Sequence, residues 1–232
     1  VVDGNRRRAM RYLLALPEGE RPEVVLLDDG FQHRYVHPSF TILLIDAQRE
    51  LHDDELLPLG GLREPATARY RADCIILTKC PHDMQPIKLR IMQRNLNLYA
   101  HQEIFFSRIH YQQPRAVRTL LGGEGSPLPK DALVIALSGI ASPGLFFSYL
   151  EERYELIDQL VYPDHHQFRR KDFVAISERW QELCEQHSGR PVYIVCTEKD
   201  AVRFTDSLGE LPEELVKQLY FLPIETQILY KP

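Results

Sequence analysis

The residues best suited to chemistry lie in one short stretch, where two acids and a glycine follow four apolar residues. Asp28, Asp29 and Gly30 come directly after the apolar run 24–27, and an amide, an imidazole and a guanidinium follow within four residues. Two adjacent carboxylates suit a divalent cation that is itself bound to phosphate, because Mg²⁺ keeps most of its waters and takes only one or two protein carboxylates. Gly30 allows a sharp turn and a close approach of the backbone to a ligand. The stretch therefore indicates a magnesium and phosphate site rather than an ordinary polar loop.

The element expected to position these acids is a buried strand. The run 24–27 is too short for a helix and lacks a 3.6-residue period, and such runs are typical of strands buried in parallel sheets. Asp28 and Asp29 would then stand at the carboxyl end of the strand, where open α/β sheets bind their ligands. Two further apolar runs, 40–46 and 72–79, predict neighbouring strands, and the first of them again ends in an acid, Asp46.

Alternation of apolar runs and amphipathic segments predicts an α/β fold. Helices are expected at 87–96 and 170–187, and strands at 103–109, 133–140, 156–162, 192–196 and in the tail from 220 to 230. This order predicts parallel βαβ units in a doubly wound sheet. Prolines and glycines gather between residues 111 and 129. We therefore expect one α/β core at 1–112, a linker at 113–130 and a second, smaller α/β lobe at 131–232.

A second pair of candidate residues is Arg63 and Glu64, which precede Pro65. Proline disfavours a helical conformation for the residue before it, so both side chains are free to project from an extended or turn dipeptide. Arginine offers a planar fork for phosphate oxygens, and glutamate offers a hard oxygen ligand. On its own, such a pair is more often a solvated ion pair on the surface.

The later part of the chain adds two smaller candidates. Asp164, His165 and His166 are consecutive, and a histidine fixed by an aspartate can take or relay a proton near neutral pH. Adjacent histidines point to different sides and no second ligand cluster accompanies them, so a zinc site is disfavoured; spacing does not tell which histidine would act. Lys199 suits either a substrate phosphate or an ion pair with an acid, and Thr197 is expected to cap a short helix with Asp200 at its third position.

Composition bounds the function classes. The 232 residues include 44% hydrophobic and 26% charged residues and carry a formal net charge of −5, which is typical of a globular protein and gives no basic field for nucleic acid. Four cysteines lack the spacing of a metal site, and Cys74 and Cys196 lie in apolar runs as expected of small buried residues. No apolar run approaches the length of a membrane span, and no signal peptide is recognised.

Five stretches together resemble one family, the tetraacyldisaccharide 4′-kinases of lipid A (lipopolysaccharide) biosynthesis. They span most of the chain in the family's order. They are DDGFQHR (28–34), LPLGGLREP (57–65), GIA with a proline (139–143), PDHH (163–166) and TEKDA (197–201).

The resemblance implies a P-loop NTPase-like fold and a lipid kinase that transfers the γ-phosphoryl group of ATP to the 4′-hydroxyl of a tetraacyldisaccharide 1-phosphate. It implies that Asp29 and Glu64 hold Mg²⁺ beside Asp28, and that Arg63 offsets charge on the phosphoryl oxygens. A histidine, His165 or His166, would assist an aspartate base that precedes this sequence in the family. The remaining roles implied are nucleotide contacts for Arg6 and Gln32 and substrate contacts for His33, Arg34 and Lys199.

The resemblance also implies ATP and Mg²⁺ as cofactors and a monomer attached peripherally to the cytoplasmic face of the inner membrane. The sequence begins with Val1 and contains no GxxxxGK[ST] phosphate loop. We therefore expect the family's phosphate loop and membrane-associating helix to precede it, and the 232 residues alone to have negligible kinase activity. Two alternatives from other classes stay open: a metal-dependent phosphohydrolase, and a non-catalytic P-loop remnant that binds a lipid or a partner.

Overall fold

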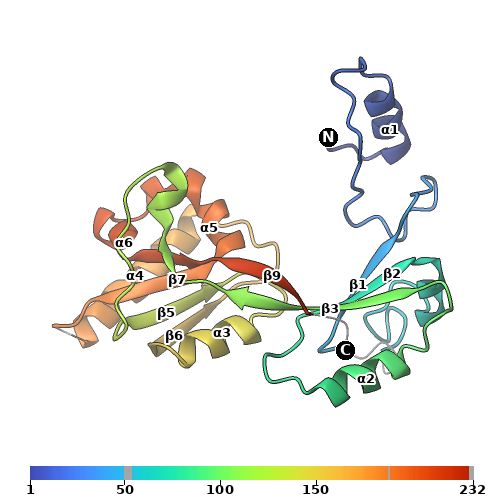
Figure 1. Cartoon of the computed structure of the whole chain (residues 1–232). Helices are drawn as coiled ribbons and strands as arrows, with labels where there is room; N and C mark the ends of the chain where they lie inside the picture. The colour runs from blue at the N-terminus through green and yellow to red at the C-terminus, as the bar shows by residue number, and fades with distance from the viewer. Residues whose placement is uncertain (50–53, 188, 230–232) are drawn as a thin grey trace. The chain divides into compact units, whose positions relative to one another are not determined.

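The computed structural model describes residues 1–49, 54–187 and 189–229, which form two compact units (Figure 1). Unit 1 comprises Val1–Ile109 with Thr226–Pro232, and unit 2 comprises His110–Glu225. Both are α/β units with mostly parallel sheets, as the sequence predicts. Residues 113–130, expected as a linker, hold a short strand, β4 (Arg115–Ala116), that pairs with β8 (Leu219–Leu222) of unit 2, and a 3₁₀ helix, η2 (Val117–Leu121).

The sheet of unit 1 is built from three parallel strands. In order across the sheet they are β1 (Ile42–Asp46), β2 (Cys74–Thr78) and β3 (Glu103–Tyr111), and β9 (Ile224–Leu229) lies next to β3. A 3₁₀ helix, η1 (Ala66–Arg71), leads into β2, and α2 (Pro86–Asn95) begins at a proline, which suits the first turn of a helix. Side chains from the strands and α2 share one core: Ile45, Ile75, Leu77, Leu89, Leu96, Ile104 and Phe106.

Unit 1 departs from the expected fold at residues 24–27. This apolar run forms no strand, and Val24 and Leu26 are 74% and 91% exposed. The prediction of a buried strand is therefore wrong for this structure. Within the described residues no other strand pairs with the run, so its backbone groups lack the ladder that a buried strand needs. The helix before it, α1 (Arg6–Leu14), is capped by the side chain of Asn5 and buries none of its residues.

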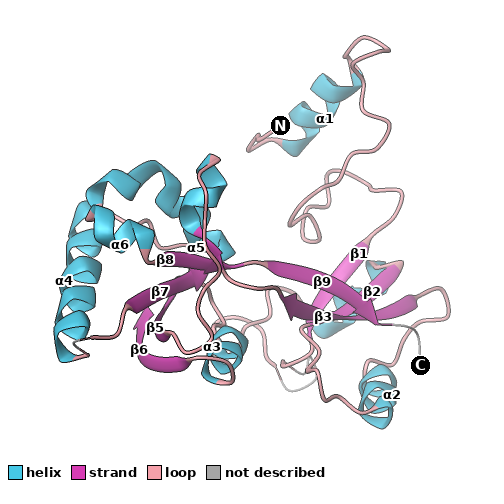
Figure 2. Ribbon diagram, turned by 60° about the vertical axis from the view of Figure 1, so that its left-hand side comes forward, coloured by secondary structure: helices cyan, strands magenta, loops and turns pink. Residues whose placement is uncertain are grey.

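Unit 2 is a sheet covered on both faces (Figure 2). Its strand order is β4-β8-β7-β5-β6, with β5 (Leu133–Ser138), β6 (Glu155–Val161), β7 (Val192–Thr197) and β8 parallel. The three inner strands, β8, β7 and β5, are buried at every position. Such continuous apolar strands are expected where helices lie on both sides of a parallel sheet.

Different helices pack on the two faces of this sheet. Alternate residues of β5 belong to different clusters: Leu133, Ile135 and Leu137 to one, Val134 and Ala136 to the other. The first cluster also contains apolar residues of α4 (Arg170–Gln186), α5 (Glu198–Phe204) and α6 (Glu213–Lys217), and the second contains those of α3 (Gly144–Glu151). A third 3₁₀ helix, η3 (Thr205–Glu210), follows α5.

Two smaller expectations can be checked against these elements. Cys74 and Cys196 are buried, as predicted, and burial raises the pKa of both thiols, most strongly that of Cys196, where Asp200 adds to the effect. No helix among the described residues combines the length and the apolar character required to cross a bilayer.

Candidate functional site

The turn at residues 28–30, called here the acidic turn of unit 1, lies beside α1. Arg6 donates from its two Nη atoms to the backbone oxygens of Asp29, at 3.0 Å, and Asp28, at 3.2 Å. Asp29 has a φ of +46°, a left-handed conformation that few residues other than glycine adopt. Both of these hydrogen bonds are to backbone oxygens, so they leave the carboxylate of Asp29 available to other partners. This carboxylate is 74% exposed.

Two ion pairs join the acidic turn to the second candidate segment. Arg63 Nη1 lies 3.7 Å from Asp29 Oδ2, and Arg34 Nη2 lies 3.6 Å from Glu64 Oε2. In each ion pair the acid comes from one segment and the arginine from the other. The structure therefore brings together the stretches 28–34 and 63–64, which are separated in the sequence by the 28 residues from 35 to 62.

Glu64 is held mainly by a residue that the sequence analysis missed. Arg71, at the end of η1, places Nη2 2.7 Å from Glu64 Oε2, in an ion pair whose angles fall outside hydrogen-bond geometry. The guanidinium also lies 4.4 Å from the centre of the Phe31 ring and donates to the Phe31 backbone oxygen. Arg71 therefore ties Glu64 to Phe31, which packs against the core of unit 1. Nothing in its spacing distinguishes Arg71 from an arginine on a solvated face.

The remaining candidates of this stretch contribute less to the cluster. His33 Nε2 is buried and has no hydrogen-bond partner among the described residues, and its ring meets Tyr35 edge to face at 5.7 Å. Gln32 is exposed. A buried imidazole nitrogen without a partner is a costly arrangement, so His33 is the member of this stretch best placed to gain a partner from a ligand.

Hard oxygen donors are present for a magnesium ion, although the described residues contain no group of three acidic, histidine or cysteine side chains that could hold a metal. Mg²⁺ needs only one or two protein carboxylates when phosphate and water supply the rest. Asp29 is exposed, and Glu64 is 19% exposed and fixed by Arg71. The donor chemistry therefore fits Mg²⁺, and Asp29 is the more exposed of the two carboxylates.

In unit 2 the candidates converge where neighbouring parallel strands end. Gly139 follows β5, Asp164 and His165 follow β6, and α5, which carries Lys199 and Asp200, follows β7. Because β7, β5 and β6 are adjacent in the sheet, their carboxyl ends form one edge. This is the edge at which open α/β sheets bind ligands.

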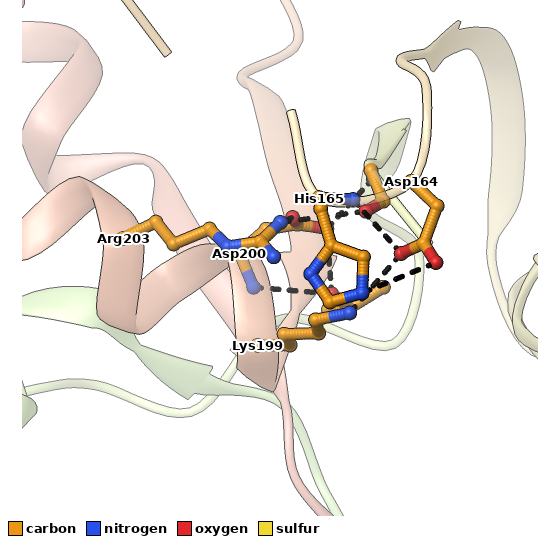
Figure 3. A network of polar contacts seen from close by, with 7 residues as sticks. Asp164, His165, Lys199, Asp200 and Arg203 are labelled. Atoms are coloured by element: carbon orange, nitrogen blue, oxygen red, sulfur yellow. Dashed lines mark hydrogen bonds and ion pairs between the residues drawn. The ribbon is translucent and has the colours of Figure 1, made fainter. Parts of the chain in front are cut away.

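Asp200 is the buried centre of this edge, with no exposed surface. Its carboxylate accepts hydrogen bonds from Thr197 Oγ1 at 2.6 Å, Gly139 N at 2.8 Å and Arg203 Nη1 at 3.2 Å (Figure 3). Thr197 caps α5 by accepting from Asp200 N, which confirms the predicted cap. The hydrogen bond from Gly139 to Asp200, however, joins residues that are 61 positions apart in the sequence. Asp200 therefore links the ends of β5 and β7.

The two histidines have different surroundings. His166 Nε2 lies 3.0 Å from Asp172 Oδ2, and its ring packs against Tyr162 and Phe168 at 4.9 Å from each. Asp172 in turn accepts from Arg169 N at the start of α4. His165, by contrast, has a side chain that is 77% exposed, against 23% for His166. The geometry leaves His165 accessible and makes His166 part of the folded structure.

Lys199 has a partner within unit 2. Its Nζ lies 3.1 Å from Asp164 Oδ1, and Asp164 Oδ2 lies 3.5 Å from His165 Nε2. Of the two possibilities left open for Lys199, the structure shows the ion pair with an acid.

Comparison with known proteins places these observations in a family. The family model for tetraacyldisaccharide-1-P 4′-kinase matches residues 1–232. A tetraacyldisaccharide 4′-kinase from Porphyromonas gingivalis is 42% identical over 230 residues, which are 99% of this chain and 63% of that protein. One from Parabacteroides distasonis is 44% identical over 231 residues, covering 97% and 60%. The chain thus spans about three-fifths of the length of these curated relatives.

A solved structure supports the fold. The crystal structure of LpxK from Aquifex aeolicus in complex with ATP resembles this chain with a TM-score of 0.58 and 21% sequence identity, over 97% of this chain and 58% of that one. At this identity the likeness establishes the fold alone. With the family model matching every residue and relatives above 40% identity, the chain belongs to the tetraacyldisaccharide-1-P 4′-kinase family.

Proposed function

We propose that the protein transfers the γ-phosphoryl group of ATP to the 4′-hydroxyl of a tetraacyldisaccharide 1-phosphate, in lipid A biosynthesis. The observation that carries the proposal is the match of the family model to the whole chain. The geometry of unit 1 supports it, because Asp29, Arg63 and Glu64 lie together although they come from separate segments.

The roles in unit 1 follow from charge and exposure. Phosphoryl transfer depends on positioning and on neutralising charge around the phosphoryl group. Asp29 and Glu64 would hold Mg²⁺, which when bound neutralises charge on the phosphate oxygens. Arg63 is 64% exposed, so its guanidinium can leave Asp29 and approach a phosphoryl oxygen. Arg6 keeps the acidic turn in its left-handed conformation through the backbone oxygens of Asp28 and Asp29.

In unit 2 we assign the histidine of the reaction to His165. It is accessible and lies beside the carboxylate of Asp164, whereas the ring nitrogen of His166 is already engaged by Asp172. An imidazole beside a carboxylate can accept and return a proton near neutral pH. His165 would thus assist the aspartate base of the family, and His166 would stabilise the turn before α4.

The proposed substrate also implies a membrane surface. A tetraacyl disaccharide resides in a lipid bilayer, so the enzyme must reach its 4′-hydroxyl at the membrane surface while taking ATP from the cytoplasm. We therefore propose peripheral attachment at the cytoplasmic face of the inner membrane, by a monomer.

The test is 4′-phosphorylation of the tetraacyl disaccharide 1-phosphate by the complete gene product, wild type against Asp29→Ala. We expect an active wild type and a loss of roughly several hundredfold in kcat/KM, because the variant lacks an exposed ligand of the metal. Glu18→Ala, which removes an exposed acid in the loop after α1, is the matched control and should retain full activity.

Each other result has a definite meaning. An active wild type with an unaffected Asp29→Ala variant would keep the kinase and refute the metal role of Asp29. A wild type without kinase activity would refute the kinase. Release of phosphate from the lipid without ATP would then favour a phosphohydrolase, and no turnover at all would favour a non-catalytic domain that binds a lipid or a partner.

A further inference from the structure

His165 adopts a backbone conformation that needs support. Its φ is +57°, in the left-handed region that residues with a side chain populate sparsely. The carboxylate of Asp164 provides the support: Oδ1 accepts a hydrogen bond from His165 N at 2.9 Å, and Oδ2 lies 3.5 Å from the ring nitrogen Nε2. One carboxylate therefore contacts both the backbone and the ring of His165. Such outliers persist where the surroundings fix them, and they gather at functional sites.

Lys199 holds that carboxylate in place. Its Nζ approaches the same oxygen, Asp164 Oδ1, that accepts from His165 N (Figure 3). The hydrogen bond from Lys199 is the largest cause that lowers the pKa of Asp164, so the group stays ionised and remains an acceptor for His165. Lys199 and the backbone of His165 therefore donate to the same carboxylate oxygen.

The position of Lys199 is in turn fixed by Asp200. Lys199 lies in the first turn of α5, between Thr197 and Asp200, which are hydrogen-bonded to each other. Asp200 also accepts a hydrogen bond from Gly139 N, which follows β5. Arg203, one turn further along α5, bonds both the carboxylate of Asp200 and the backbone oxygen of Gly139, at 3.4 Å. Asp200 and Arg203 thus attach α5 to Gly139 at the edge of the sheet, and Thr197 at the end of β7 donates to the carboxylate of Asp200.

We propose that Lys199 and Asp164 are positioning residues, which set the orientation of His165 for phosphoryl transfer, and that the buried Asp200 anchors the turn from which Lys199 projects. The inference rests on the proposed function, in which His165 assists the reaction. It is an alternative to the expectation that Lys199 binds a substrate phosphate, and it is supported by the ion pair that the ammonium group forms with Asp164.

Kinetics of the complete gene product test the proposal. A positioning residue is expected to change kcat, whereas a phosphate ligand changes KM for the lipid. We expect Lys199→Met to lower kcat roughly tenfold at constant KM, and Lys199→Arg to retain most of the activity because it can still reach Asp164. Lys217→Met is the matched control: Lys217 is also a half-exposed helical lysine of unit 2, paired with Glu213, and its loss should leave both constants unchanged. A raised KM with an unchanged kcat would overturn the proposal.

A double variant locates the effect at His165. If Lys199 acts through His165, then Lys199→Met should cost nothing more in a His165→Ala background, because residues that act as a unit are not additive. A further tenfold loss in that background would show that Lys199 acts on its own and would overturn the positioning role.

A spectroscopic measurement separates this proposal from the proposed function. In ¹⁵N-labelled protein, the backbone amide signal of His165 should move in Lys199→Met and stay in Lys217→Met, because only Lys199 shares the oxygen that accepts from this amide. An unmoved signal would refute positioning even if the enzyme is an active kinase. A moved signal together with an inactive wild type would uphold the contact while refuting the kinase.

Discussion

The two candidate clusters use aspartate in opposite ways. Asp29 of unit 1 belongs to an irregular turn, is 74% exposed, and faces one arginine across 3.7 Å. Asp200 of unit 2 follows a fully buried strand, is itself buried, and accepts three hydrogen bonds from the protein. An exposed carboxylate with one long ion pair can bind a ligand. A buried carboxylate whose contacts all lie within the protein can only stabilise the folded structure. In the proposed function, Asp29 is accordingly a residue that acts on the reactants, and Asp200 is one that holds the fold of unit 2 in place.

The largest expected effect on stability tests this separation directly. Asp200→Ala should destabilise unit 2 by about 3 kcal/mol, because it leaves Gly139 N and Arg203 without the acceptor around which they are arranged. Asp29→Ala should cost about 1 kcal/mol or less, because the side chain is exposed and the only penalty is that of alanine in the left-handed conformation. Urea unfolding measures both. Fluorescence of Trp180, the single tryptophan, reports on unit 2 since its Nε1 donates to Val192 O, and circular dichroism follows the whole chain.

The comparison would fail if the two aspartates proved equally costly to remove. A stability loss near 3 kcal/mol for Asp29→Ala would mean that the acidic turn is a structural element. An unaffected Asp200→Ala variant would mean that the contacts of Asp200 are replaced by water at little cost.

A glycine at the same edge gives a smaller and more local test. A Cβ added to Gly139 would lie 2.9 Å from Asp200 Oδ1, and that carboxylate cannot move aside without losing its hydrogen bonds. Gly139→Ala should therefore cost about 1–3 kcal/mol, measured by the fluorescence of Trp180. Gly144→Ala is the control, because a Cβ added there would meet no atom within 4 Å and alanine favours a helix; it should be neutral or slightly stabilising. Equal losses in both variants would show that crowding at Asp200 is not the cause.

How far the sequence alone predicts these clusters depends on the range of the interactions. Apart from the two-residue strand β4, which lies in the expected linker, the strands of both sheets and the cap by Thr197 follow from local pattern, and the structure has them close to the expected residues. The strand expected at 24–27 is absent from the structure. An apolar pattern shows that a strand would be stable once it is paired, but it does not show that a neighbouring strand is there to pair with. Local pattern therefore predicts elements better than their burial.

Contacts between distant segments explain the other omissions. The hydrogen bond from Gly139 to Asp200, the ion pair of Arg71 with Glu64 and the choice between His165 and His166 all depend on which chain ends meet in space. Two adjacent histidines have the same sequence surroundings. In the structure His166 contacts Asp172, six residues further along, and the rings of Tyr162 and Phe168, whereas His165 contacts Asp164. The sequence predicted which residues gather at each site more fully than it predicted their partners.

The smallest effect concerns pH and Asp164, which contacts both Lys199 of α5 and His165. The hydrogen bond from Lys199 lowers the pKa of Asp164 in the folded protein. A lowered pKa stabilises the fold at pH values above the ordinary carboxyl range, and this stabilisation is lost as the pH falls through the pKa of the folded state. Asp164→Asn should therefore lower the urea midpoint modestly at about pH 6, and the gap to wild type should close toward about pH 3.

The size of the gap is itself informative. Asp164 is about one-third exposed, so solvent screens its pairing with Lys199 and the stability difference should be small beside that of Asp200→Ala. Other carboxylates with lowered pKa values, such as Asp172, titrate alike in both proteins and cancel from the difference. A gap that stays constant from pH 6 to 3 would show that the ionised form of Asp164 does not contribute, and Asp164 would then support His165 by its shape rather than by its charge.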